Sequence, residues 1–211
     1  MNPSYFVNVS QSEPGLVNPA RHSVRYDDFV NKLLKPDSIK MTALHIGLGI
    51  AGEALEFVEA LDSWYNNWSA KPDPEAITHL IEELGDLEFY MQAAQTFYGV
   101  TDVDAREHAT VTVNSAQPII TTTYLGILAE SGNLSDLIKK EFIYGKPREI
   151  KLILTAMYRL RSHLLGMYHA MSTERAHVLQ CNALKLETRY AGLVYSAEAA
   201  IARADKPHES T

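Results

Sequence analysis

The chain has a single cysteine, no long apolar run and no excess of positive charge, and each lack narrows what the protein can be. Among its 211 residues only Cys181 carries a thiol, so no intrachain disulfide can form and a cytoplasmic setting is expected. No run of about 18 or more apolar residues occurs, so we expect no membrane span, and the first residues lack a signal-peptide pattern. The net charge of −7 disfavours binding to nucleic acid or to an anionic membrane.

The composition nevertheless supports one sizeable core. Hydrophobic residues make up 46% of the chain and charged residues 21%, which is ordinary for a globular protein. A chain of this length buries enough surface to need neither a disulfide nor a structural metal. We expect an N-terminal extension over 1–37, a single domain over 38–205 and a disordered tail over 206–211.

Apolar residues recur every three or four positions, whereas clusters of β-branched residues are short, so the sequence predicts an all-α fold. The first long helix is expected from about Ser38 to Trp64, and the second from Pro74 to Phe97, with Gly99 ending it. The other expected helices are Tyr26–Leu34, about Thr101–Asn114, Ile120–Phe142, Arg148–Met171 and Thr173–Ala204, the last capped by Ser172 and Thr173.

A short pattern occurs twice and indicates an internal duplication. Leu48-Gly49-Ile50 followed by Glu53 recurs as Leu125-Gly126-Ile127 followed by Glu130, each within a long predicted helix. Leu80-Ile81 then aligns with Leu152-Ile153 in the next helix of each half. We therefore expect two repeats, over about 38–115 and 116–205, that form a helical bundle around one four-helix core.

The first repeat carries two pairs of carboxylates at helical spacing, Glu53-x-x-Glu56 and Glu83-x-x-Asp86. Residues three apart are neighbours on a helix surface, so each pair points in one direction. In an antiparallel hairpin the two pairs can face each other, and four carboxylates in one place repel unless cations neutralise them. Mg²⁺ fits this oxygen-rich donor set, and Mn²⁺ could substitute for it.

The strings LGIAGEALE and EELGDL, with their order and their gap, resemble the motifs E-x-x-E and E-x-x-D of the MazG-like all-α nucleoside triphosphate pyrophosphohydrolases. The resemblance covers about 38–195 and implies a helical bundle of two fused MazG-like repeats. It also implies that Glu53, Glu56, Glu83 and Asp86 form a catalytic Mg²⁺ cluster that cleaves an NTP or dNTP to monophosphate and pyrophosphate. Tyr90 occupies the place of an aromatic residue that lies near the sugar in related members.

The second repeat resembles the family without its acids. Glu130 corresponds to Glu53, whereas Asn133, Thr155 and Tyr158 replace the other three carboxylates. Its closing segment, with Asn182, Lys185 and Arg189, is similar to the family's N-x-x-K-L-x-x-R-Y, whose polar residues approach the phosphates. The chain thus resembles the tandem members with a degenerate second repeat, which implies one site per chain.

Two other readings of the sequence stay open. A carboxylate-bridged di-iron bundle needs Glu-x-x-His on two helices, and only Glu174–His177 fits. A non-catalytic nucleotide sensor or helical scaffold is the alternative to an enzyme. Trp64, Trp68 and His45 are candidates to contact a base. The sequence fits pool cleaning, dUTP removal or nucleotide supply in a phage-infected cell, and it fits either a monomer with an internal pseudo-dimer or a homodimer.

Overall fold

The computed structural model describes residues 25–66, 74–100 and 116–202. These residues are helical, with no strand among them, which confirms the all-α prediction. The expected helix over 101–114 and the tail over 206–211 lie outside the described residues. The elements are α1 (Tyr26–Leu33), α2 (Ile39–Asn66), α3 (Pro74–Tyr98), α4 (Ala116–Phe142), α5 (Ile150–Ala170), α6 (Arg175–Arg189), the short 3-10 turn η5 (Ala191–Leu193) and α7 (Ala197–Ala202).

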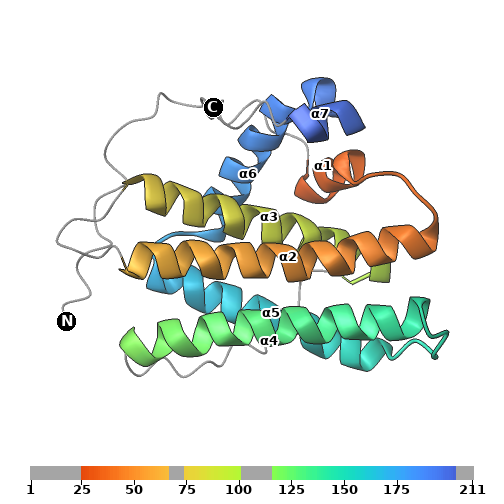
Figure 1. The fold of residues 1–211 in the computed structure, drawn as a ribbon, viewed down its shortest axis with the longest axis horizontal. Coiled ribbons are helices and arrows are strands. Elements are labelled where there is room, and N and C mark those ends of the chain that lie inside the picture. Colours follow the sequence, from red (N-terminus) through yellow and green to blue (C-terminus); the bar gives the residue numbers. More distant parts are fainter. Residues whose placement is uncertain (1–24, 67–73, 101–115, 203–211) are drawn as a thin grey trace.

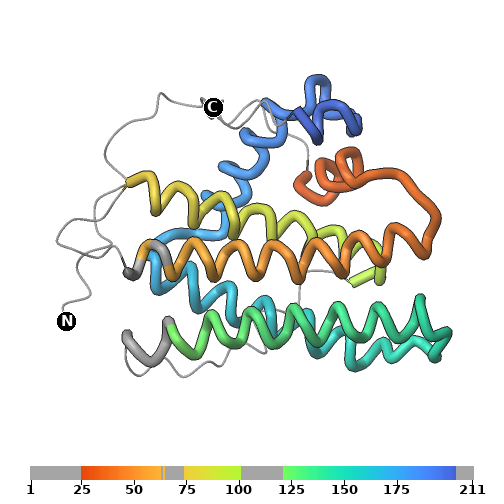
Figure 2. The backbone as a smooth tube through the Cα atoms, in the orientation of Figure 1, coloured from red at the N-terminus to blue at the C-terminus, as the bar shows by residue number. Residues whose placement is uncertain are grey.

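Two helical hairpins form the centre of the molecule. We call α2 with α3 the first hairpin and α4 with α5 the second. They join along α2 and α4 (Figure 1). Helix α6 crosses α3 and passes behind it in the view of Figure 1. Helix α1 lies near α7 at one end of the first hairpin (Figure 2).

Local sequence explains where the long helices begin and end. The Ser38 hydroxyl accepts a hydrogen bond from the backbone N–H of Met41 at 3.3 Å, which caps the start of α2. Pro74 opens α3, where its missing N–H leaves no bond unmade. Gly99 adopts a φ of 67° beyond the end of α3, and the Val100 N–H bonds back to the Gln95 carbonyl at 2.8 Å.

The prediction of one helix over Thr173–Ala204 is wrong. Helix α6 ends at Arg189, and the chain then turns through Gly192 and Leu193, which both have a positive φ. Two successive left-handed residues cannot continue a right-handed helix. The predicted caps are wrong as well, because α6 follows Glu174 in extended conformation.

The two hairpins bury the same helix faces in the same order. In α2 and α4, Ile50 and Phe57 correspond to Ile127 and Leu134, each 77 positions later, and all four side chains are fully buried. In α3 and α5, five buried apolar positions of α3 have a buried apolar counterpart 73 positions later: Leu80 and Ile153, Leu84 and Met157, Leu87 and Leu160, Met91 and Leu164, Ala94 and Met167. The short repeated string therefore belongs to a longer repeated pattern of burial.

Within the described residues, one segment, Ile39–Asp62 of α2, is long and apolar enough to cross a membrane by length and composition alone. Its buried face packs against α3 and α4, and its other face carries Glu56 and Glu59. Such a segment is equally typical of a helix at the centre of a bundle.

Candidate active site

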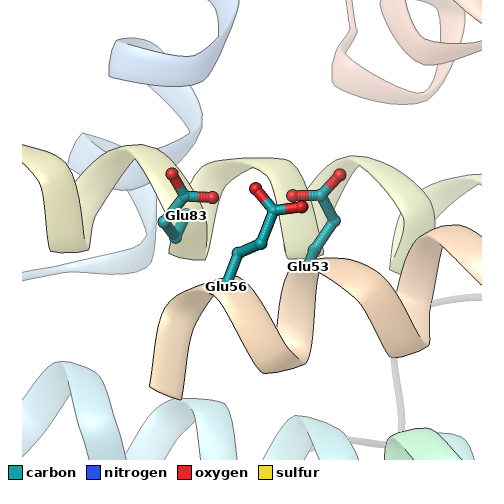
Figure 3. A group of neighbouring side chains, drawn as sticks. All are labelled: Glu53, Glu56 and Glu83. Atoms are coloured by element: carbon teal, nitrogen blue, oxygen red, sulfur yellow. The ribbon is translucent and has the colours of Figure 1, made fainter. Parts of the chain in front are cut away.

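Three of the four predicted carboxylates converge between the helices of the first hairpin. Glu53 and Glu56 rise from α2 toward α3, which supplies Glu83 (Figure 3). One carboxylate oxygen from each lies within 4.8 Å of the other two. Glu83 is buried, Glu53 is partly buried and Glu56 is exposed, so the cluster runs from the helix interface out to solvent.

The close approach of these acids changes their protonation. Burial, together with the neighbouring charges of Asp86, Glu56 and Glu83, raises the pKa of Glu53 to about 8. Without a cation, Glu53 therefore keeps its proton at neutral pH. A divalent cation among these oxygens would reverse the balance, because it favours the ionised carboxylate.

Asp86, the fourth predicted carboxylate, is held by α6. Asn182 Nδ2 donates a hydrogen bond to Asp86 Oδ1 at 2.8 Å, and the Lys185 ammonium pairs with Oδ2. Gly85 permits this contact, because a Cβ there would lie 2.8 Å from the Asn182 Cβ. Thus Asn182 and Lys185 contact a carboxylate of the site, and neither lies on a solvated helix face.

The acids open into a pocket of about 680 Å³. Glu53, Glu56 and Asp86 line one part of it, and Arg189 of α6 lines another. The remaining lining mixes polar residues, namely Lys35, Asp37 and His45, with apolar and aromatic ones that include Leu33, Leu44, Leu48, Phe89, Tyr190 and Tyr195. A pocket with acids, a guanidinium and aromatic rings suits a ligand that has both charged and flat apolar parts.

Tyr90 lies at the wall of this pocket. A Cβ on Gly49 would lie 2.4 Å from the Tyr90 ring, so the ring can pack directly on α2 only because residue 49 is glycine. The Tyr90 hydroxyl and His45 Nε2 are 3.2 Å apart, at hydrogen-bonding distance. Burial, together with the charges of Glu53 and Asp86, raises the pKa of Tyr90, so its hydroxyl stays protonated.

Of the residues that the sequence offered for contact with a base, the structure places one at the pocket and one away from it. His45 lines the pocket beside Tyr90. Trp64 is buried in the core and does not line the pocket, so that interpretation is wrong for it. Trp68 lies outside the described residues.

Sequence reasoning missed a buried ionic network next to the site. Glu88 is fully buried on α3, where Arg161 and Tyr168 of α5 and Arg175 of α6 all donate to its carboxylate. The Tyr168 bond is 2.5 Å long, and the bond from Arg175 Nη2 is 3.1 Å. These partners lower the pKa of Glu88 to about 2, against the opposing effect of burial. The network ties both hairpins and α6 together two residues beyond Asp86.

The second hairpin carries a different set of groups in the corresponding place. The repeat of buried positions aligns Glu83 with Ala156 and Asp86 with Arg159, so the predicted counterparts Thr155 and Tyr158 are one residue out of register. Arg159 Nη1 lies 3.5 Å from Glu130. A guanidinium thus stands beside the one retained carboxylate.

Comparison of the chain with family models, with curated proteins and with solved structures finds no match. The resemblance to the MazG-like enzymes therefore stays a prediction that rests on the two carboxylate motifs and the closing segment of the sequence.

Proposed function

We propose that the protein is a Mg²⁺-dependent nucleoside triphosphate pyrophosphohydrolase, which hydrolyses an NTP or dNTP to the monophosphate and pyrophosphate. The observation that carries the proposal is the convergence of Glu53, Glu56 and Glu83 within 4.8 Å, at the edge of a pocket that also offers Arg189 and several aromatic rings. The triphosphate of such a substrate matches the charged lining, and its flat base matches the aromatic lining.

The donor set fits magnesium. All three converging groups are carboxylates, which are the ligands that Mg²⁺ prefers, and the raised pKa of Glu53 marks an excess of negative charge there. Glu53, Glu56 and Glu83 would hold the metal, with Asp86 beside them as the fourth carboxylate ligand. When bound, the metal would neutralise phosphate charge and supply the Lewis acidity that makes a water nucleophilic.

The other side chains would bind and orient the substrate. Arg189 is always charged and can form paired hydrogen bonds with phosphate oxygens, so it would hold the outgoing pyrophosphate. Lys185 neutralises Asp86 and keeps its carboxylate in place. Tyr90, fixed against Gly49 and beside His45, would contact the sugar. The apolar wall formed by Leu33, Tyr190 and Tyr195 would cover the nucleoside and keep water away from it.

The duplicated form of the family accounts for the rest of the fold. We propose that the second hairpin derives from a second repeat whose site has degenerated, so that each chain has one active site. The repeated pattern of buried positions supports this origin, and the Arg159–Glu130 pair supports the loss of a metal site there.

The test is a product analysis. The purified protein is incubated with Mg²⁺ and each of the eight standard ribo- and deoxyribonucleoside triphosphates and dUTP, and products are separated by chromatography. We expect monophosphate and pyrophosphate from at least one substrate, and none after chelation of the metal. Diphosphate and phosphate as products would contradict the proposed reaction.

The alternative is a nucleotide sensor or scaffold without turnover, and one observation favours it. Lys185 already occupies Asp86, and a carboxylate neutralised by a lysine is a weaker metal ligand. A sensor would bind a nucleoside triphosphate with Mg²⁺ and leave it intact. Calorimetric binding without any product in the assay above would support this alternative over the enzyme.

A further inference from the structure

Helix α1 lies outside both hairpins, yet one of its side chains reaches the candidate site. Tyr26 opens α1, and its hydroxyl donates a hydrogen bond to Asn182 Oδ1 at 2.8 Å. Its ring stacks on Phe29 with centroids 5.8 Å apart. Burial, with the charges of Glu88 and Asp86, raises the pKa of Tyr26 well above its usual value, so the hydroxyl remains a donor.

Asn182 connects this hydroxyl to Asp86. Its amide has an acceptor at one end and donors at the other, and the two ends serve different partners. Oδ1 accepts from Tyr26, while Nδ2 donates to Asp86 Oδ1 at 2.8 Å. With only 1% of Asn182 exposed, water cannot replace either partner. Loss of the Tyr26 hydroxyl would leave a buried carbonyl oxygen without its donor, so the amide would turn away from its present plane.

The Asp86 carboxylate is consequently held at both oxygens from α6. Asn182 binds Oδ1 and Lys185 binds Oδ2, and Gly85 lets α6 lie close enough for both contacts. Of these two contacts, the one through Asn182 is itself anchored by Tyr26. The orientation of the carboxylate thus depends on a residue about sixty positions earlier in the chain.

We infer that Tyr26 is a positioning residue for Asp86, acting through the Asn182 side chain, and that α1 is a part of the active site. Three observations carry this: the chain of hydrogen bonds, the burial of its central amide, and the contribution of Leu33, at the other end of α1, to the pocket wall. The inference rests on the proposed function, because Asp86 affects turnover only if the site hydrolyses a substrate. Helix α1 thus takes part in the site although the sequence assigned residues 1–37 to an N-terminal extension.

The first test is Tyr26→Phe, which removes the hydroxyl and keeps the ring. We expect kcat to fall about tenfold with KM within about twofold, since partners that orient a ligating carboxylate typically matter to that degree. The matched control is Tyr124→Phe on α4, a partly buried tyrosine in the second hairpin, which should leave both constants unchanged. A kcat for Tyr26→Phe within about twofold of the wild type would overturn the inference.

A double variant distinguishes positioning from a general loss of stability. If Tyr26 acts through Asn182, then Tyr26→Phe adds no further loss of kcat to Asn182→Ala. A structural defect would act independently of Asn182, so the two losses would multiply. Multiplied losses would therefore overturn the proposed route.

A third measurement separates this inference from the proposed function. In the folded protein the Asn182 side-chain amide protons should exchange slowly with solvent, and Tyr26→Phe should accelerate their exchange by about tenfold or more, as followed by nuclear magnetic resonance. If the wild type hydrolyses no nucleotide but this acceleration occurs, the proposed function fails and the positioning of Asn182 by Tyr26 stands. Unchanged exchange would overturn the positioning role whatever the enzyme assay shows.

Discussion

The first and second hairpins bury the same faces but differ in the charged groups that they carry at corresponding positions. The first gathers Glu53, Glu56 and Glu83, where burial and the neighbouring carboxylates raise the pKa of Glu53 to about 8. The second sets Arg159 3.5 Å from Glu130. The clustered acids of the first hairpin therefore carry an excess of negative charge, which a dissolved cation could neutralise. In the second hairpin the Arg159 guanidinium provides the positive charge.

The difference extends to the residues around each cluster. Gly49 receives the Tyr90 ring and Gly126 receives the His163 ring, so both hairpins keep a glycine where two helices meet. Helix α6 packs against α3 of the first hairpin, where it brings Asn182 and Lys185 to Asp86. The two hairpins therefore have the same apolar packing and differ in the polar side chains around it.

The largest difference should appear in turnover. Glu83→Gln removes a converging carboxylate without changing the volume of the side chain, and we expect kcat/KM to fall by about 10²–10³-fold or more. The matched change in the second hairpin, Glu130→Gln, should leave kcat/KM unchanged. Circular dichroism of both variants checks that the helices remain. Equal losses in the two variants would contradict a single site in the first hairpin.

The next effect concerns the ionic network that joins the hairpins. Glu88→Gln leaves Arg161 and Arg175 facing a neutral group, and we expect the free energy of unfolding to fall by about 3–5 kcal/mol. The folded-state pKa of about 2 lies below the usual value, so the stabilisation is present above about pH 4.5 and is lost as the pH falls toward 2. Urea unfolding from pH 2 to above pH 4.5 measures the free energy of unfolding and its dependence on pH in the wild type and in Glu88→Gln. Glu59→Gln, on the exposed face of α2, is the control.

Glu53 should show the opposite dependence on pH. Its folded-state pKa of about 8 exceeds the usual value of 4.5, so the folded protein binds a proton that the unfolded chain has released. In the absence of divalent cations, stability should therefore fall as the pH rises from about 4.5 to 8. Glu53→Gln should flatten this fall and raise the melting temperature at pH 8, while Glu130→Gln should change neither. A steeper fall in Glu53→Gln would refute the charge repulsion.

The smallest expected effect tests the shared packing. Gly49→Ala and Gly126→Ala each place a methyl group within about 2.4 Å of a ring, and overpacking of this kind typically destabilises by about 1–3 kcal/mol. Only Gly49→Ala should also raise KM, because it displaces Tyr90 from the pocket wall. Thermal unfolding and substrate titration of the two variants give the comparison. An unchanged KM in Gly49→Ala would contradict the proposed contact between Tyr90 and the substrate.

Helical periodicity predicted most of the fold, and the two motifs predicted which acids converge. The end of α6 could not be predicted, because Leu193 adopts a positive φ that nothing in its residue type favours. The alignment of the second hairpin failed by one residue because it matched Leu152-Ile153 to Leu80-Ile81 by identity. Only the buried faces show that Ile153, and not Leu152, is the counterpart of Leu80.

The connections around Asp86 depend on tertiary structure in the same way. The sequence singled out Asn182 and Lys185, but it assigned them to phosphates, whereas both contact Asp86. Their spacing of three positions indicates a shared helix face without identifying what that face meets. The bonds of Tyr26 and Glu88 join residues more than seventy positions apart and have no local signal.

The Arg159–Glu130 pair has a consequence for how such a protein can change over generations. A guanidinium encoded in the chain cannot be removed by a chelator or by scarcity of magnesium, and it does not depart with a product. If the second hairpin derives from a duplicated metal site, such a pair makes its charge balance independent of the ion concentration in the cell. The hairpin can then accumulate other substitutions, provided that its buried face persists. Under the proposed function the first hairpin needs a dissolved ion, so its acids stay under the constraint that metal binding imposes.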